Sequence, residues 1–109
     1  MKKIYLFCSA GMSTSILASK MQAAADENSL PIEVKAYPHN ELDEIIKKHH
    51  PDCILLGPQV KYLYEKTVND FGPSGIPIAV IDPTDYGMMN AKKVLKSAIK
   101  LIKASSESK

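Results

Sequence analysis

Short apolar runs alternate with segments of helical periodicity along the whole chain. The apolar runs lie at residues 4–7, 32–37, 53–56 and 76–81. A segment with apolar residues at helical spacing follows each run before the next one begins. Because parallel strands need long crossover connections, strands that alternate with helices predict an α/β fold built around a parallel sheet.

The helical segments carry their apolar residues three and four positions apart, as amphipathic helices do. The polar segment at residues 104–109 predicts a frayed tail after the last helix. We predict a first helix over residues 13–28, a second capped by Asn40, a short third over residues 60–68, and a last one that begins between Tyr86 and Asn90.

The first two apolar runs differ in a way that predicts their places in the sheet. The first is continuously apolar, which is typical of a strand buried on both faces, whereas the second alternates apolar and charged residues, which favours a sheet edge. We therefore predict a four-stranded parallel sheet in the order 2-1-3-4, with helices on both faces. Ligands of such sheets bind beyond the carboxyl ends of the strands, here where strands 1 and 3 adjoin.

Composition narrows the class of protein further. A length of 109 residues predicts one domain over residues 1–109, and 45% apolar with 24% charged residues is ordinary for a soluble globular protein. A net charge of +2 and few aromatic residues argue against a nucleic-acid partner. The uncharged run at residues 4–19 is too polar for a secretory signal or a membrane span, so we expect a cytoplasmic protein.

The most informative segment follows the first predicted strand. Cys8 stands at the strand end, and a loop of small residues leads from it into the first helix. The helix N-terminus presents unpaired N–H groups and partial positive charge, which favour a thiolate nucleophile and can hold a phosphate dianion. Cys8 is therefore the predicted nucleophile, and the predicted phosphate-binding residues are Ser9, Ala10, Gly11, Met12, Ser13, Thr14 and Ser15.

Two further loops are expected on the same rim, because they follow the third and fourth predicted strands. Asp82 and Asp85 leave two interpretations open: a general acid for a leaving group, or a structural role such as helix capping. The candidate rim residues are Gln59, Asp82, Tyr86 and Gly87.

The remaining cysteine and histidines predict little chemistry. Cys53 lies within an apolar run, so we expect a core residue. His49 and His50 are expected to be solvated near a helix C-terminus, and the sequence shows no ligand spacing typical of a metal site. We therefore predict no metal and no cofactor.

The loop after Cys8 is similar to that of low-molecular-weight tyrosine phosphatases, in which Cys and Arg flank five residues. Asp82-Pro83 resembles the general-acid loop of that family. The position of the Arg corresponds here to Ser15 or the nearby Thr14, and all 14 basic residues of the chain are Lys. Since such enzymes need a guanidinium to clamp the transferring phosphoryl group, the sequence argues against a phosphatase or an arsenate reductase.

A closer resemblance covers the whole chain. KIYLFCSAGMSTS at residues 3–15, LLGPQV at residues 55–60, and VID at residues 80–82 with Tyr86-Gly87 resemble the lactose/cellobiose/chitobiose-type IIB components of the sugar phosphotransferase system. The resemblance implies a phosphotransferase in which Cys8 accepts a phosphoryl group from a phosphohistidine on a IIA protein. It implies that Cys8 then passes this group to a disaccharide bound by a membrane IIC protein.

The same resemblance gives a reason for the absence of arginine. A carrier must hold its phosphoryl group without helping water to attack it, and backbone amides can do so without a guanidinium clamp. Two alternatives remain: a phosphatase or arsenate-reductase-like enzyme, and a non-catalytic regulatory module on the same fold.

Overall fold

The computed structural model confirms the predicted fold class and strand order. It describes the backbone of residues 2–8 and 11–107 and the side chains of residues 2–8 and 14–104. The sheet is parallel throughout, in the order β2-β1-β3-β4. Its strands are β1 (Lys2–Cys8), β2 (Ile32–Pro38), β3 (Cys53–Leu56) and β4 (Ile78–Val80).

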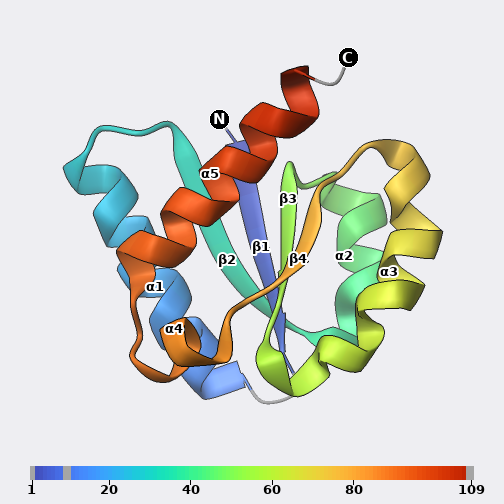
Figure 1. The fold of residues 1–109 in the computed structure, drawn as a ribbon, viewed down its shortest axis with the longest axis horizontal. Helices are drawn as coiled ribbons and strands as arrows, with labels where there is room; N and C mark the ends of the chain where they lie inside the picture. The colour runs from blue at the N-terminus through green and yellow to red at the C-terminus, as the bar shows by residue number, and fades with distance from the viewer. Residues whose placement is uncertain (1, 9–10, 108–109) are drawn as a thin grey trace.

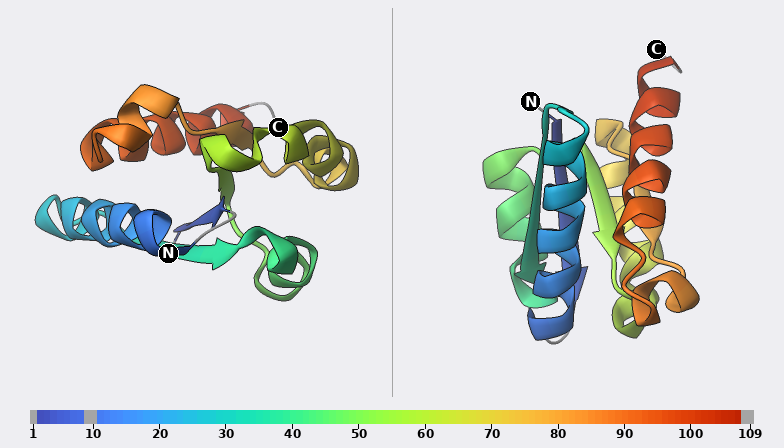
Figure 2. Two further views of the ribbon diagram at one scale, coloured as in Figure 1. Left: turned by 90° about the horizontal axis from the view of Figure 1, so that it is seen from below. Right: turned by 90° about the vertical axis from the view of Figure 1, so that its left-hand side faces the viewer.

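Two pairs of helices cover the two faces of the sheet (Figures 1 and 2). On one face, α1 and α5 pack on Ile4, Leu6 and Leu55, while α2 and α3 pack on the opposite face against Tyr5 and Phe7. The α-helices are α1 (Gly11–Glu27), α2 (Leu42–His49), α3 (Tyr64–Phe71), α4 (Pro83–Gly87) and α5 (Ala91–Glu107).

The central strand explains the continuous apolar pattern at the start of the chain. Residues 4–8 of β1 are all buried, because β1 lies between β2 and β3 and has helices on both faces. On the edge strand β2, by contrast, Lys35 is exposed and Val34 is buried. Apolar and polar residues therefore alternate along β2 because only one of its faces is buried, whereas β1 is continuously apolar because both of its faces are buried.

The carboxyl ends of the strands meet at one end of the molecule, at the bottom of Figure 1, together with α4 and the first turn of α1. Backbone hydrogen bonds join the segments there. The N–H of Gly57 donates to the carbonyl of Phe7 at 2.8 Å, and the N–H of Ile81 donates to the carbonyl of Leu56 at 2.8 Å. The three loops that follow β1, β3 and β4 thus begin side by side, as the sheet order predicts.

Several predicted boundaries are wrong for local reasons. Asn40 lies inside a 3-10 turn, η1 (His39–Glu41), and α2 begins after Glu41 without a side-chain cap. The segment predicted as the third helix divides into η2 (Pro58–Leu63) and α3. β4 covers only residues 78–80 of the apolar run at residues 76–81. A 3-10 turn, η3 (Gly72–Ser74), precedes it.

The C-terminal part of the chain differs from the prediction at both of its ends. A separate helix, α4, precedes the last helix, so α5 begins at Ala91 rather than between Tyr86 and Asn90. α5 also continues to Glu107, which makes residues 104–107 helical where the sequence predicts a frayed tail. Residues 108–109 of that predicted tail lie outside the described residues.

Candidate active site

Cys8 is the last residue of β1 and pairs with Pro38 in the register of β1 with β2. Only 1% of its surface is exposed. Helix α1 begins three residues later, at Gly11, so the backbone N–H groups of a helix N-terminus follow the thiol directly in the chain. The structure therefore places the predicted nucleophile at the carboxyl end of the central strand.

The predicted phosphate loop is only partly described. Ser9 and Ala10 lie outside the described residues, and Gly11, Met12 and Ser13 are described as backbone in the first turn of α1. Their predicted contacts with a phosphoryl group therefore stay predictions. The two remaining loop residues, Thr14 and Ser15, are described with their side chains and differ from each other.

Thr14 is fully buried, and its hydroxyl lies 2.9 Å from the hydroxyl of Tyr86. Tyr86 is also buried, and its hydroxyl lies 3.8 Å from Cys8 Sγ. The predicted phosphate-loop threonine thus meets the predicted rim tyrosine, and this pair contacts the thiol. Sequence spacing could not show this contact, because 72 residues separate the two hydroxyls.

Ser15 is exposed and lines a groove between α1 and β2. These two adjacent residues of α1 therefore differ in burial: the side chain of Thr14 lies in the core beside Cys8, whereas that of Ser15 lies at the surface. Ser15 stays a predicted phosphate-binding residue, with no contact to Cys8 among those described.

Gln59 approaches the thiol from the loop after β3. Cys8 Sγ donates to Gln59 Oε1 at 3.5 Å, which confirms the expected proximity of this rim residue. The loop after β3 also brings Gly57 close to the thiol. A Cβ built on Gly57 would lie 3.0 Å from Gln59 Oε1 and 3.3 Å from Cys8 Sγ, so a larger residue here would require these side chains to shift by a few tenths of an ångström.

Asp82 and Asp85 have partners away from the thiol. Asp82 Oδ1 accepts from the N–H groups of Thr84 at 2.8 Å and Asp85 at 3.3 Å, which makes Asp82 the N-cap of α4. The buried Asp85 pairs with Lys93 Nζ at 3.4 Å. These contacts favour the structural interpretation of both carboxylates.

Gly87, the last predicted rim residue, is the final residue of α4 and is exposed. A Cβ built on it would have no heavy atom within 4 Å. Gly87 therefore does not resemble Gly57, and the structure gives no close contact that requires glycine at this position.

The second cysteine is a core residue, as predicted. Cys53 begins β3 at the amino end of the sheet and is fully buried. Burial, with a smaller effect from the negative charge of Asp52, raises the pKa of its thiol from 9.0 to about 12. Cys53 is therefore protonated, and a poor nucleophile, at neutral pH.

The described residues offer no group of three or more His, Cys, Asp and Glu side chains that could hold a metal ion. Within the same part of the chain, no helix is both long and apolar enough to cross a membrane.

Taken together, these features define a class of site. A thiol at the end of a central parallel strand, followed by a helix N-terminus and flanked by an amide and a hydroxyl, is suited to nucleophilic attack on a phosphoryl group. The chain contains no arginine. The site thus has the parts of a cysteine phosphate site without a guanidinium clamp.

Comparisons of the sequence with known proteins agree with this class. Residues 3–97 match the sequence model of the family of lactose/cellobiose-specific IIB subunits of the phosphotransferase system. The chain is 42% identical over 104 residues to a galactose-specific EIIB component of Lactococcus lactis subsp. cremoris, covering 93% of this chain and 96% of the relative. It is 41% identical, with the same coverage, to a cellobiose-specific EIIB component of Lactococcus lactis subsp. lactis.

A third relative and two solved structures extend the similarity. An oligo-beta-mannoside-specific EIIB component of Bacillus subtilis is 36% identical, covering 94% of this chain and 97% of the relative. The solution structure of a cellobiose-specific IIB component protein from Borrelia burgdorferi has a TM-score of 0.77 at 34% identity, covering 95% and 94% of the two chains. The lactose-specific IIB component domain of Streptococcus pneumoniae, at 20% identity, shares the fold with a TM-score of 0.81 and covers 91% and 95%.

The chain therefore belongs to the family of lactose/cellobiose-specific IIB subunits of the phosphotransferase system. It is a phosphotransferase component that acts in the transfer of phosphoryl groups to sugars. This assignment confirms the class that the strand-end cysteine and its surroundings indicate.

Proposed function

We propose that Cys8 is the phosphoryl carrier of this IIB subunit. In the first step, Cys8 Sγ attacks the phosphorus of a phosphohistidine on a IIA protein, so that a P–S bond forms and the P–N bond breaks. The histidine nitrogen keeps the electron pair and takes up the thiol proton. In the second step, a sugar hydroxyl attacks the same phosphorus, which forms a P–O bond, releases the thiolate and frees the hydroxyl proton. No net oxidation or reduction occurs.

One observation carries this proposal. Cys8 Sγ lies at the carboxyl end of the central strand, 3.5 Å from Gln59 Oε1 and 3.8 Å from the hydroxyl of Tyr86, and the N-terminus of α1 follows it. Backbone N–H groups of that terminus and the Tyr86 hydroxyl are donors of the kind that phosphoryl oxygens accept. The Gln59 side chain presents an N–H₂ group when its amide turns over, so it can serve the phosphorylated state as well as the free thiol.

The carboxylates support a carrier over a hydrolase. A phosphatase needs an acid for the leaving group and a cationic clamp for the phosphoryl oxygens. Asp82 caps α4, and Asp85 pairs with Lys93 at 3.4 Å, so both carboxylates are engaged away from Cys8. With no arginine in the chain, the site can hold a phosphoryl group but has little to speed its hydrolysis.

The partners and sugar of the proposal follow from the family. The phosphoryl donor is a IIA protein with a phosphohistidine, and the acceptor is a disaccharide bound by a membrane IIC protein. Relatives of nearly equal identity are named for galactose, cellobiose and oligo-beta-mannosides, so we propose a cellobiose-, chitobiose- or lactose-like sugar as the class. A carrier between these two proteins acts on the cytoplasmic side of the membrane.

The test is the intact mass of the protein after incubation with phosphoenolpyruvate, the general phosphotransferase proteins and a cognate IIA protein. Wild type and the control Cys53→Ala should each gain one phosphoryl group, whereas Cys8→Ser should gain none. The added group should be labile as a thiophosphate is, and it should leave when IIC and sugar are added. Equal phosphorylation of wild type and Cys8→Ser, or no gain on wild type with an active IIA protein, would overturn the proposal.

A further inference from the structure

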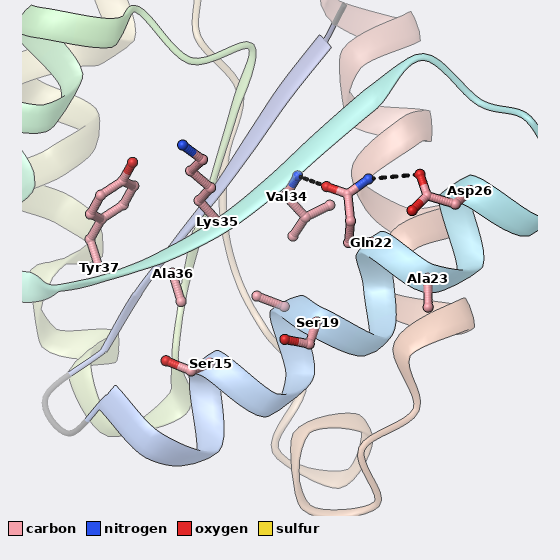
Figure 3. A pocket seen from close by; sticks show the side chains of 10 residues that line it. Ser15, Ser19, Gln22, Ala23, Asp26, Val34, Lys35, Ala36 and Tyr37 are labelled. Atoms are coloured by element: carbon pink, nitrogen blue, oxygen red, sulfur yellow. Dashed lines mark hydrogen bonds between the residues drawn. The ribbon is translucent and has the colours of Figure 1, made fainter.

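The side chain of Gln22, outside the candidate active site, makes an unusual set of contacts with the edge of the sheet. Its Oε1 accepts from the N–H of Val34 at 2.8 Å, and its Nε2 donates to the carbonyl of Ile32 at 2.9 Å. Nε2 also donates to Asp26 Oδ1 at 3.1 Å, one helical turn further along α1. Figure 3 shows Gln22 reaching from α1 to the backbone of β2 at Val34, with Asp26 beside it on α1.

These bonds have the pattern of a neighbouring strand. A side-chain amide carries one carbonyl and one N–H₂ group, so it can pair with a strand as a peptide group does. β2 is the edge of the sheet, and β1 covers its other side. Because peptide groups of a strand point alternately to its two sides, the Ile32 carbonyl and the Val34 N–H face the open edge together.

Beyond Gln22, only the end of the strand limits pairing along this edge among the described residues. Pro38, the last residue of β2, lacks an N–H group, which limits the length over which another strand can pair. Before it, the alternation of β2 points the peptide groups of Ala36 to the same side as those of Val34. A groove of about 630 Å³ runs beside this part of the edge, and small side chains of α1, including Ala18 and Ser19, form its other wall.

We propose that the outer edge of β2 is a latent strand-pairing surface, which the amide of Gln22 keeps closed to a second copy of this chain. With Gln22 in place, a second strand cannot reach the Val34 N–H or the Ile32 carbonyl. The Val34 carbonyl and the Ala36 peptide groups that remain are too few for a stable ladder. A second copy is the occupant that fits, because two β2 edges related by a two-fold axis present the same open groups to each other.

The first experiment measures amide hydrogen exchange by NMR in wild type and in Gln22→Leu, at a protein concentration low enough to keep both monomeric. We expect the Val34 amide to exchange at least about tenfold faster in Gln22→Leu, the factor that corresponds to about 1.4 kcal/mol. The Ala36 amide, on the same edge, should exchange rapidly in both proteins. Unchanged protection of Val34 would overturn the role of Gln22.

The second experiment measures molar mass by light scattering on a sizing column as the protein concentration rises. Gln22→Leu should move from monomer toward dimer, while wild type should not. Gln22→Glu keeps an acceptor for the Val34 N–H and adds charge at the edge, so it should stay monomeric even where its stability falls. This variant separates closure of the edge from loss of stability.

The matched control is Lys20→Leu, which adds the same apolar side chain at an exposed position of α1. It should remain monomeric, because the edge of β2 stays closed. Association of Lys20→Leu as strong as that of Gln22→Leu would overturn the proposal, since apolar exposure alone would then explain the dimer. A monomeric Gln22→Leu with a fast-exchanging Val34 amide would overturn it as well.

Discussion

The two cysteines of this chain are equally buried and lie on neighbouring strands, yet their surroundings differ completely. Cys8 is 1% exposed and Cys53 0%. Cys8 ends β1 at the carboxyl edge of the sheet, with Gln59 and Tyr86 within hydrogen-bonding reach. Cys53 begins β3 at the amino edge and belongs to the hydrophobic core beneath α1 and α5.

The difference shows that burial alone does not decide what a cysteine in this fold can do, because its place along the strand sets which groups surround it. At the carboxyl ends, the chain leaves the sheet through loops that bring an amide, a hydroxyl and a helix N-terminus to one point. At the amino end, Cys53 meets apolar neighbours and the carboxylate of Asp52, both of which oppose a thiolate. The same residue type is therefore a candidate nucleophile at one edge and a packing residue at the other.

The largest expected effect is a difference in alkylation between the two thiols. A pKa raised from 9.0 to about 12 leaves Cys53 with about a thousandfold less thiolate below pH 9 than an ordinary thiol. In Cys8→Ser, alkylation by iodoacetamide should therefore be about a thousandfold slower in the folded protein than in urea. Its rate should keep rising with pH toward 12, because the folded thiol deprotonates only there.

The control for this measurement is Cys53→Ala, in which Cys8 is the sole thiol. Its folded-state alkylation at neutral pH should exceed that of Cys8→Ser, and mass spectrometry gives both rates. If Cys53 in folded Cys8→Ser were alkylated at pH 8 as fast as in the urea-unfolded chain, the predicted difference in reactivity between the two cysteines would be wrong.

A smaller effect should follow from filling the space beside Cys8. Gly57 has φ −62° and ψ 152°, which alanine adopts without strain, so Gly57→Ala acts through its methyl group alone. That methyl group would meet Gln59 Oε1 at 3.0 Å and Cys8 Sγ at 3.3 Å. We expect phosphoryl transfer to Cys8 to fall by about ten- to a hundredfold, because small displacements of reacting groups have effects of this size.

Gly87→Ala is the matched control, since its methyl group would meet no heavy atom within 4 Å. Stopped-flow or quench measurements of transfer from a phosphorylated IIA protein compare the two variants, and circular dichroism checks the fold of each. Equal transfer rates in both variants would mean that the close approach of Gly57 to Cys8 does not affect phosphoryl transfer.

The smallest expected effect concerns the buried hydroxyl pair that flanks Cys8. Tyr86→Phe removes one hydroxyl and leaves Thr14 Oγ1 buried without its partner at 2.9 Å, so we expect a loss of about 1 kcal/mol in the free energy of unfolding. Adding Thr14→Val to Tyr86→Phe removes the Thr14 hydroxyl that has lost its partner. Urea unfolding of the two single variants and the double variant should show that the double loss is smaller than the sum. Strictly additive losses would show that the two hydroxyls are not coupled.

The sequence predicts the architecture well because strand burial and helical periodicity are patterns of neighbouring residues. The order 2-1-3-4 follows from a continuously apolar β1 and an alternating β2, and the structure confirms it. Local capping was less predictable. Asn40 is a favourable cap in isolation, but the chain forms a 3-10 turn there, and α2 begins only after Glu41. Tertiary packing overrides such weak preferences.

The candidate site was likewise predictable only in part. Its location and Cys8 could be predicted, because the ends of parallel strands converge by topology. The contact of Thr14 with Tyr86, the close approach of Gly57 to Cys8, and the bonds from Gln22 to β2 could not, since each depends on groups brought together from distant parts of the chain. Asp82 shows an intermediate case: a structural role was foreseen, but the helix that it caps, α4, was not.

The burial of Cys8 also has a kinetic consequence for the proposed relay. With 1% of its surface exposed, Cys8 leaves little of its sulfur open to a partner. In the proposed relay, donor and acceptor proteins would then have to approach the same sulfur in turn, so we expect double-displacement kinetics. Unphosphorylated donor would compete with the permease for the loaded subunit, which makes the ratio of the two partners a control on the rate of sugar uptake.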